Sequence, residues 1–114
     1  MVEIKATLRS LHIAPRKVRL VADRLRGLSV KKAEVELSFR VKRASQPLLK
    51  LLRSAMANAS HNAKILNPGE VLFVKSIRVD EGRPFKRSMP RAHGRASPIR
   101  KRTSHIMLTL MSKD

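Results

Sequence analysis

The residues best suited to chemistry in this chain are its cations, and they gather in one segment. Eight of the residues from 81 to 102 are Lys or Arg, and no Asp or Glu occurs between Glu81 and Asp114. Arginine carries a planar, permanently charged fork that matches phosphate oxygens in pairs and stacks on bases. Small residues such as Ala92 and Gly94 lie between the cations and let the backbone approach another surface. The segment from Gly82 to Arg102 therefore predicts a contact element for a polyanion.

The charge of the whole chain indicates the same kind of partner. The 114 residues include 26 Lys and Arg against 8 Asp and Glu, a formal charge of +18. Such an excess opposes the compact state through self-repulsion, and a bound polyanion relieves it. RNA, DNA and an anionic membrane surface are all consistent with this charge. The high share of Arg in the basic segment favours a nucleic acid.

Other chemistry is poorly supported by the residue pattern. Glu34 and Glu36 are two positions apart and would not share a helix face, so they do not form a general acid and base pair. The chain has no cysteine, which excludes a disulfide framework and a cysteine nucleophile. We expect neither an enzyme nor a bound metal or cofactor. No metal-ligand spacing relates the four histidines His12, His61, His93 and His105.

Hydrophobic periodicity predicts the elements that hold the basic segment in place. Residues 2–11 alternate like a half-buried strand. A helix is expected from Pro15 to a stop at Gly27, and Ser29 can cap a second, short helix. A third helix over 42–63 has a wide apolar stripe, which indicates a central position.

Two more strands follow, at 71–80 and 103–111. Val71, Phe73, Ile77 and Val79 are expected on one face of the first, and a turn is expected at 67–69. Strands grouped apart from helices predict an α+β fold, in which a small three-stranded antiparallel sheet packs against three helices. We expect a single domain, with a body at 1–80 and 103–114 and a long extended hairpin at 81–102.

The connection between the last two strands is too long for an ordinary hairpin loop, which has two to five residues. It is either a disordered basic loop or an extended hairpin that continues the flanking strands. Ten residues per arm would reach about 30 Å. An isolated two-stranded hairpin is marginal in water, so we expect phosphates to fix this one.

Three separated motifs resemble the bacterial form of the large-subunit ribosomal protein twenty-two family. They are APRKVRLVAD at 14–23, SAMANA at 54–59, and MPRAHGRA at 89–96 followed by KRTSHI at 101–106. The resemblance implies a compact body on the surface of the large subunit and a hairpin that enters the folded rRNA. It also implies that the hairpin tip lines the nascent-peptide exit tunnel, with roles in translation and subunit assembly. His93 and Leu28 depart from the basic residues that are common at those positions.

The resemblance and the charge pattern together give the candidate site residues. The RNA-binding set is Arg9, Arg16, Lys17, Arg19, Arg83, Lys86, Arg87, Arg91, Arg95, Arg100, Lys101, Arg102 and His105. The tunnel-lining tip is Arg87, Ser88, Met89, Pro90, Arg91, Ala92, His93, Gly94 and Arg95. His105 is expected to contact RNA or to pack.

The expected partners are large-subunit rRNA, neighbouring ribosomal proteins and the nascent polypeptide, without a membrane and without a homo-oligomer. The first residues have no apolar stretch typical of a signal peptide, so the ribosome of the cytoplasm is the expected location. Two other functions compete with this one. An architectural DNA-binding protein would bind duplex DNA equally well. A cationic membrane-surface protein would need a helix whose apolar face is free of the core.

Overall fold

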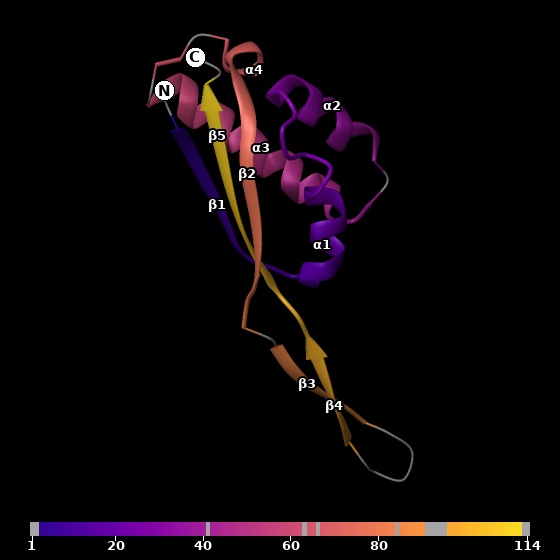
Figure 1. Cartoon of the computed structure of the whole chain (residues 1–114). Coiled ribbons are helices and arrows are strands. Elements are labelled where there is room, and N and C mark those ends of the chain that lie inside the picture. Colours follow the sequence, from indigo (N-terminus) through magenta and orange to yellow (C-terminus); the bar gives the residue numbers. More distant parts are fainter. Residues whose placement is uncertain are drawn as a thin grey trace.

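The computed structural model describes residues 3–40, 42–62, 64–65, 67–83, 85–90 and 96–112; for 85–90 and 96–101 it describes the backbone. Four helices and five strands lie in this part of the chain (Figure 1). Their order is β1 (Glu3–Leu11), α1 (Pro15–Ala22), α2 (Val30–Phe39), α3 (Ser45–His61), α4 (Pro68–Val71), β2 (Leu72–Glu81), β3 (Phe85–Pro90), β4 (Ala96–Lys101) and β5 (Ser104–Ser112).

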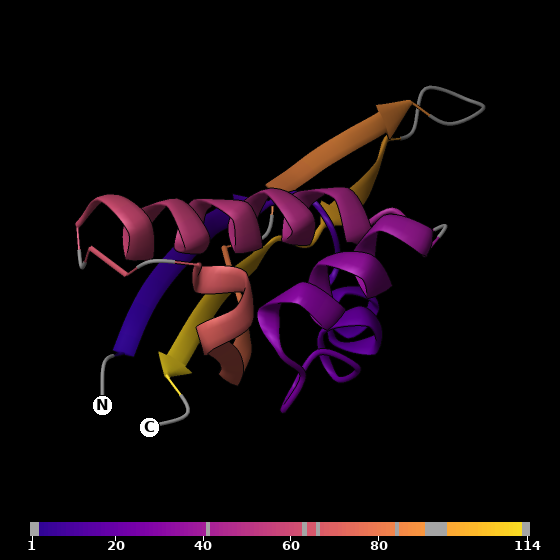
Figure 2. The same ribbon diagram turned by 90° about the horizontal axis from the view of Figure 1, so that it is seen from above.

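The predicted α+β architecture is confirmed. Strands β1, β5 and β2 form an antiparallel sheet in that order, and β3 pairs with β4 in a separate two-stranded sheet. The helices cover one face of the larger sheet, with α3 lying across it (Figures 1 and 2). Three rows of apolar side chains cross this face: Ile4, Leu110 and Val74; Ala6, Leu108 and Ile77; and Leu8, Ile106 and Val79.

Helix α3 is central, as its wide apolar stripe predicts. Its Leu48, Leu52, Ala55 and Ala59 are almost fully buried, and Leu51 is also in the core. The helix contacts both α2 and β1. A helix that packs on two sides needs apolar residues around more than half of its circumference, which explains the width of the stripe.

The first two helices begin as predicted, but α1 is shorter than expected. Pro15 occupies the first turn of α1, and the Ser29 hydroxyl accepts a hydrogen bond of 3.3 Å from the Lys32 N–H at the start of α2. Helix α1 ends at Ala22, and turns continue to Gly27, whose φ of +83° is the left-handed conformation expected of a glycine stop.

The outer edge of β2 is closed by the segment between α1 and α2. The Gly27 N–H donates to the Val74 carbonyl at 2.9 Å, and the Val74 N–H donates to the Leu28 carbonyl at 2.8 Å. Farther along the strand, Arg26 donates to the Ile77 carbonyl at 2.8 Å and Arg19 donates to the Val79 carbonyl at 2.9 Å. Backbone and guanidinium donors therefore replace a further strand.

The predicted face of β2 is wrong for its first residues. Val71 belongs to the one-turn helix α4 and is exposed, while Phe73 is only half-buried. The register with β5 shifts between Val74 and Ser76, and this bulge moves the buried set from Leu72 and Val74 to Ile77 and Val79. The turn expected at 67–69 leads directly into α4, which the sequence pattern did not predict.

Candidate nucleic-acid interface

The two-stranded sheet leaves the body where β2 and β5 end. The Gly82 N–H donates to the Thr103 carbonyl at 2.8 Å, and the Thr103 hydroxyl donates to the Arg83 carbonyl at 2.9 Å. Thr103 is 1% exposed, so the hydroxyl that donates to the Arg83 carbonyl is buried in this junction. We call residues 81–83 and 102–104 the hairpin root. Its hydrogen bonds continue the pairing of the larger sheet toward β3 and β4.

Gly82 is required at the root by close packing. A Cβ atom at this position would overlap the Thr103 Oγ1 and would lie 3.1 Å from the His105 ring. The overlap is far inside van der Waals contact, so any side chain would force the strands apart. The His105 Nδ1 also accepts a hydrogen bond of 3.0 Å from the Ser10 N–H, which ties the root to the end of β1.

Beyond the root, β3 and β4 form what we call the arm, residues 85–90 and 96–101. Phe85 lies opposite Lys101, and the ladder continues to Pro90 opposite Ala96. Lys86 lies opposite Arg100 in this register. Directly opposed like charges destabilise an antiparallel pair, and a polyanion around the arm would remove that repulsion. The six paired residues on each side span about 20 Å.

The arm makes the molecule elongated. The radius of gyration is 17.1 Å and the principal extents are 64 × 26 × 18 Å. A compact chain of this length would have a radius of gyration of about 13 Å. Figure 1 shows the arm running away from the helices along the direction of β2 and β5. The shape suits insertion into another structure rather than burial of the arm against its own body.

Three neighbouring clefts lie on the helix side of the body, and two of them reach the hairpin root. The first, of about 370 Å³, is lined by Arg16, Arg19, Glu81 and Arg102 together with the start of α1. The second, of about 300 Å³, shares Ala14 and Arg102 with it. The third, of about 280 Å³, shares Ile13, Lys17 and Arg43 with the second. The clefts form one continuous surface, and we call its cations the basic collar: Arg16, Lys17, Arg19, Lys42, Arg43 and Arg102.

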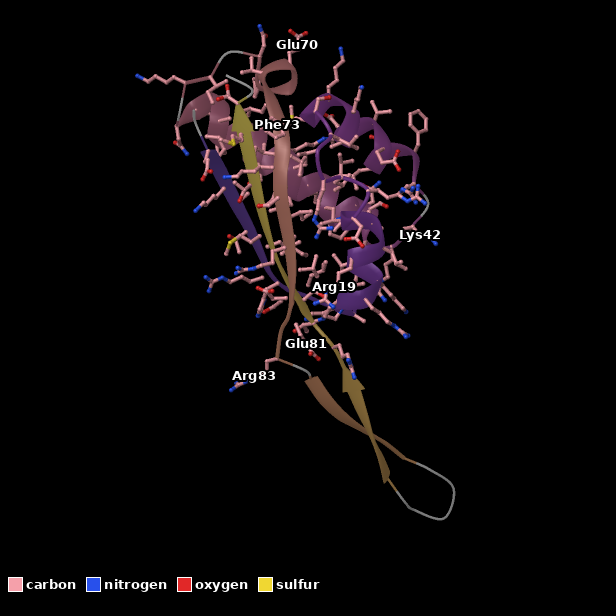
Figure 3. The ribbon with its side chains drawn as sticks, viewed as in Figure 1. Arg19, Lys42, Glu70, Phe73, Glu81 and Arg83 are labelled. Atoms are coloured by element: carbon pink, nitrogen blue, oxygen red, sulfur yellow. The ribbon has the colours of Figure 1, made fainter. Side chains whose placement is uncertain are left out.

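Hydrogen bonds within the body hold the collar in place. The buried Ser104 hydroxyl donates to the Ile13 carbonyl at 2.6 Å and fixes the segment before α1 against β5. The bond from Arg19 to Val79 fixes α1 against β2. Figure 3 shows Arg19 and Glu81 beside each other at the root, while Arg83 points away from the helices. The backbone that carries the collar is therefore already in place before a ligand binds, so ligand binding has to order only the side chains.

Most of the charge of the collar has no acidic partner in the part of the chain that the structure describes. Arg102 lies 3.7 Å from Glu81, and both side chains are more than half exposed. Arg16, Lys17, Lys42 and Arg43 form no ion pair with the described acids. Helix α1 also begins here without an acidic residue in its first turn and without a side-chain cap. Its partial positive charge adds to that of the cations.

Comparison with known proteins shows the family of this chain. Residues 6–111 match the model of the family described as ribosomal protein L22p/L17e. The chain belongs to the L22p/L17e ribosomal protein family. It is 49% identical over 113 residues to the large ribosomal subunit protein uL22 of Desulfitobacterium hafniense strain Y51, which covers 99% of this chain and 97% of that protein. It is 48% identical to the uL22 of Acholeplasma laidlawii over 98% of this chain and 99% of that protein.

Membership of the L22p/L17e family confirms the resemblance given by the three motifs and the prediction of a large-subunit ribosomal protein that is not an enzyme. The described residues contain no group of three or more His, Asp and Glu side chains that could hold a metal ion. None of the helices in the described ranges is long and apolar enough to cross a bilayer.

The structure brings together four of the candidate site residues, Arg16, Lys17, Arg19 and Arg102, in the collar of this L22p/L17e protein. Arg9 and Arg83 are exposed on β1 and at the root. The structure describes the backbone of Lys86, Arg87, Ser88, Met89, Pro90, Arg100 and Lys101 in the arm. The candidate residues Arg91, Ala92, His93, Gly94 and Arg95 lie outside the described residues.

Two candidate residues have contacts inside the body. Arg19 uses one guanidinium nitrogen on the Val79 carbonyl, so only part of its hydrogen-bonding capacity faces the cleft. His105 is half-buried between Ser10 and Gly82, which is the packing contact rather than an outward-facing one. Both residues therefore position the root, and their contact with RNA stays a prediction.

Sequence reasoning missed Lys42 and Arg43. The two adjacent cations before α3 were visible as a pair, but nothing local places them beside α1, which is more than twenty residues earlier. The fold brings residues 42–44 to the same cleft as Ile13, Lys17 and Leu20. A pair of exposed cations just before a buried helix is a weak signal, since most such pairs are solvated.

Proposed function

We propose that this chain binds large-subunit rRNA through the basic collar and the arm, stabilises the folded rRNA, and takes part in subunit assembly and translation. The observation that carries the proposal is the continuous collar at the point where the arm leaves the body. Phosphates bound there would guide the arm into the RNA, because Lys and Arg contacts to phosphates supply most of the affinity for nucleic acids. Neighbouring ribosomal proteins are further partners in this setting.

The tip of the hairpin, residues 87–95, lines the nascent-peptide exit tunnel in this proposal. The support is geometric and comes from the family resemblance. The paired part of the arm extends about 20 Å beyond the root, and its outer residues, from Arg87 onward, belong to the tip. Collar and arm side chains would neutralise rRNA, and the tip would meet the nascent polypeptide. The proposal also treats 1–80 with 103–114 as a body that folds without 81–102.

A salt titration tests the collar. The full chain is titrated onto deproteinised large-subunit rRNA at several salt concentrations, as wild type and as the double variant Lys17→Ala/Arg43→Ala. The slope of log affinity against log salt should fall by about two units or less, since each lost phosphate contact removes at most about one.

The matched control is Lys5→Ala/Lys64→Ala, which removes two exposed cations outside the collar. This control should change the slope less than the collar variant does. Equal slopes for the two variants would show that binding depends on net charge alone and would contradict the collar. A wild-type chain that does not bind the rRNA would overturn the proposal.

Photo-cross-linking tests the tip. A photoreactive residue at Met89 should cross-link to the nascent chain in ribosomes stalled during translation. The same photoreactive residue at Met107, on the sheet face away from the helices, serves as the control and should not cross-link to the nascent chain. Cross-linking from Met107 but not from Met89 would reverse the proposed orientation.

The membrane alternative receives no support from the described helices. Helices α1, α2 and α3 bury their main apolar stripes in the core. An interfacial helix needs a wide free apolar face, whereas the exposed large apolar residues of these helices are only Leu20 on α1 and Val35 and Phe39 on α2. The DNA alternative is tested by the same titration with duplex DNA, which should bind more weakly than rRNA at equal salt.

A further inference from the structure

The most exposed large apolar side chain in the described part of the chain is Phe39. It is 82% exposed and is the last residue of α2. Val35, one turn earlier, is 51% exposed. The opposite side of α2 is buried through Val30, Ala33 and Leu37. The ring is therefore outside the core in the folded body, although the chain has only three Phe and neither Tyr nor Trp.

The local backbone keeps the ring uncovered. Arg40, directly after Phe39, has an extended conformation with φ −81° and ψ 127°, so the chain turns away from the helix axis at this point. Lys32, Val35 and Phe39 are spaced three and four residues apart and share one face of α2. The exposed face thus carries a cation, an aliphatic side chain and an aromatic ring in a row.

The charges around this face are unbalanced. Both acids of α2 are already engaged, because Glu36 accepts from Arg40 at 2.7 Å and Glu34 lies 3.6 Å from Arg53. Lys31 and Lys32 on α2 form no ion pair with the described acids. Lys42, three residues beyond Phe39, belongs to the basic collar and points outward at the side of the body (Figure 3).

An exposed ring among unpaired cations suits one kind of partner. Unstacked bases of RNA stack on aromatic side chains while nearby Lys and Arg bind the adjoining phosphates. An apolar pocket of another protein would cover the ring, but it would leave the surrounding positive charge unsatisfied. In sequence, Phe39 also precedes the collar residues Lys42 and Arg43 by only three and four positions.

We propose that Phe39 stacks on an unpaired base of the large-subunit rRNA, with Lys32 and Lys42 binding the phosphates on either side. This inference rests on the proposed rRNA binding and extends the interface from the collar across the end of α2. It assigns a base contact to a surface that otherwise offers phosphate contacts, and this base contact requires a nucleotide whose base is unstacked and accessible.

A tryptophan reporter tests the stacking directly. The variant Phe39→Trp has a single Trp and no Tyr, so its fluorescence reports on this one position. Binding of deproteinised large-subunit rRNA should quench that fluorescence and protect it from acrylamide. Met107→Trp, on the other face of the sheet, is the control and should stay accessible. If rRNA binds and the indole of the Phe39→Trp variant remains as accessible as in the free chain, the inference is wrong.

An affinity series separates stacking from simple apolar contact. Phe39→Ala should weaken rRNA binding by about tenfold, in line with the usual loss when one stacked base loses its aromatic partner. Phe39→Leu should weaken it similarly, because Leu has no aromatic face, whereas Phe39→Tyr should retain the affinity. Circular dichroism should show that all variants are folded, since the side chain is exposed.

The outcomes separate this inference from the proposal on which it rests. A wild-type chain that fails to bind rRNA would overturn both. A wild-type chain that binds, with Phe39→Ala or Phe39→Leu binding equally well, would overturn the stacking alone and leave the collar standing.

Discussion

Two strands of the larger sheet, β2 and β5, and the two strands of the arm lie on the same two stretches of chain, yet different forces hold them. In the body, β2 and β5 lie under helices, and side chains from both strands enter the core on either side of the bulge at Val74 to Ser76. In the arm, β3 and β4 pair only with each other, and Lys86 lies opposite Arg100. Burial stabilises the first region, whereas the second has neither a third strand nor balanced charge.

This difference indicates that the body and the arm have different roles. The body supplies the folding free energy through its core. The arm has strand geometry, and in the proposed function a partner of opposite charge would stabilise it. We infer that a variant in one region should affect one property and spare the other.

The largest effect should follow removal of the arm. Deleting 84–98 should leave the body folded, because the core residues lie outside this range. The same deletion should abolish retention on large subunits through a high-salt wash, which sedimentation and immunoblotting would measure. Wild-type chain is the control. Loss of the body's helical circular dichroism would show that body and arm are not separable.

A core variant should show the opposite pattern. Leu52→Ala removes a side chain that is 2% exposed, and it should lower the free energy of unfolding by about 2–5 kcal/mol. Arg87→Ala in the arm should change that free energy by about 0.5 kcal/mol or less. Urea denaturation of the free chain measures both. Equal destabilisation would mean that the arm contributes to the core.

The hairpin root should be sensitive to a single methyl group. Gly82→Ala should cost about 1–3 kcal/mol, because the new Cβ would overlap the Thr103 hydroxyl. In a Thr103→Ala background the same change should cost less, since the atom in closest contact is gone. A double-mutant cycle by urea denaturation gives the coupling. If the destabilisations caused by Gly82→Ala and Thr103→Ala simply add, the new Cβ atom does not act through the Thr103 hydroxyl.

The smallest effect concerns an exposed ion pair across the sheet. Lys75 donates a hydrogen bond to Glu3, and this bond, with the ammonium charge, lowers the pKa of Glu3 below its ordinary value of 4.5. The pair therefore stabilises the folded chain at pH values above 4.5. This stabilisation is lost as the pH falls through the lowered pKa of Glu3. Glu3→Gln should flatten the acid side of a melting profile slightly, and salt should reduce the difference. An unchanged profile at low salt would contradict the pair.

Much of the fold followed from local patterns. The alternation over 2–11, the Ser29 cap and the stripe at 48–59 each reflect one element and its nearest environment, so they predicted β1, α2 and α3 correctly. The face of β2 did not follow, because a bulge changes the register without any strong local signal between Val74 and Ser76. A period of two holds only while the ladder is regular.

The candidate site was predictable in its charge but not in its assembly. Arg16, Lys17 and Arg102 were identified from the motifs, whereas Lys42 and Arg43 join them only through tertiary packing. The internal bonds of Arg19 and His105 were equally invisible, since their partners Val79 and Ser10 are distant in sequence. Phe39 was not singled out, because a single sequence does not reveal which apolar residue stays outside the core.

The closed edge of β2 has a consequence for the free chain before it meets RNA. With Arg19, Arg26 and the segment 27–29 occupying that edge, the larger sheet can add strands only beyond β1. Growth of a β-fibre requires two open edges on each copy, whereas one open edge allows pairing of two copies at most. The free chain is therefore protected from open-ended polymerisation through its body by two arginines and the turn at 27–29.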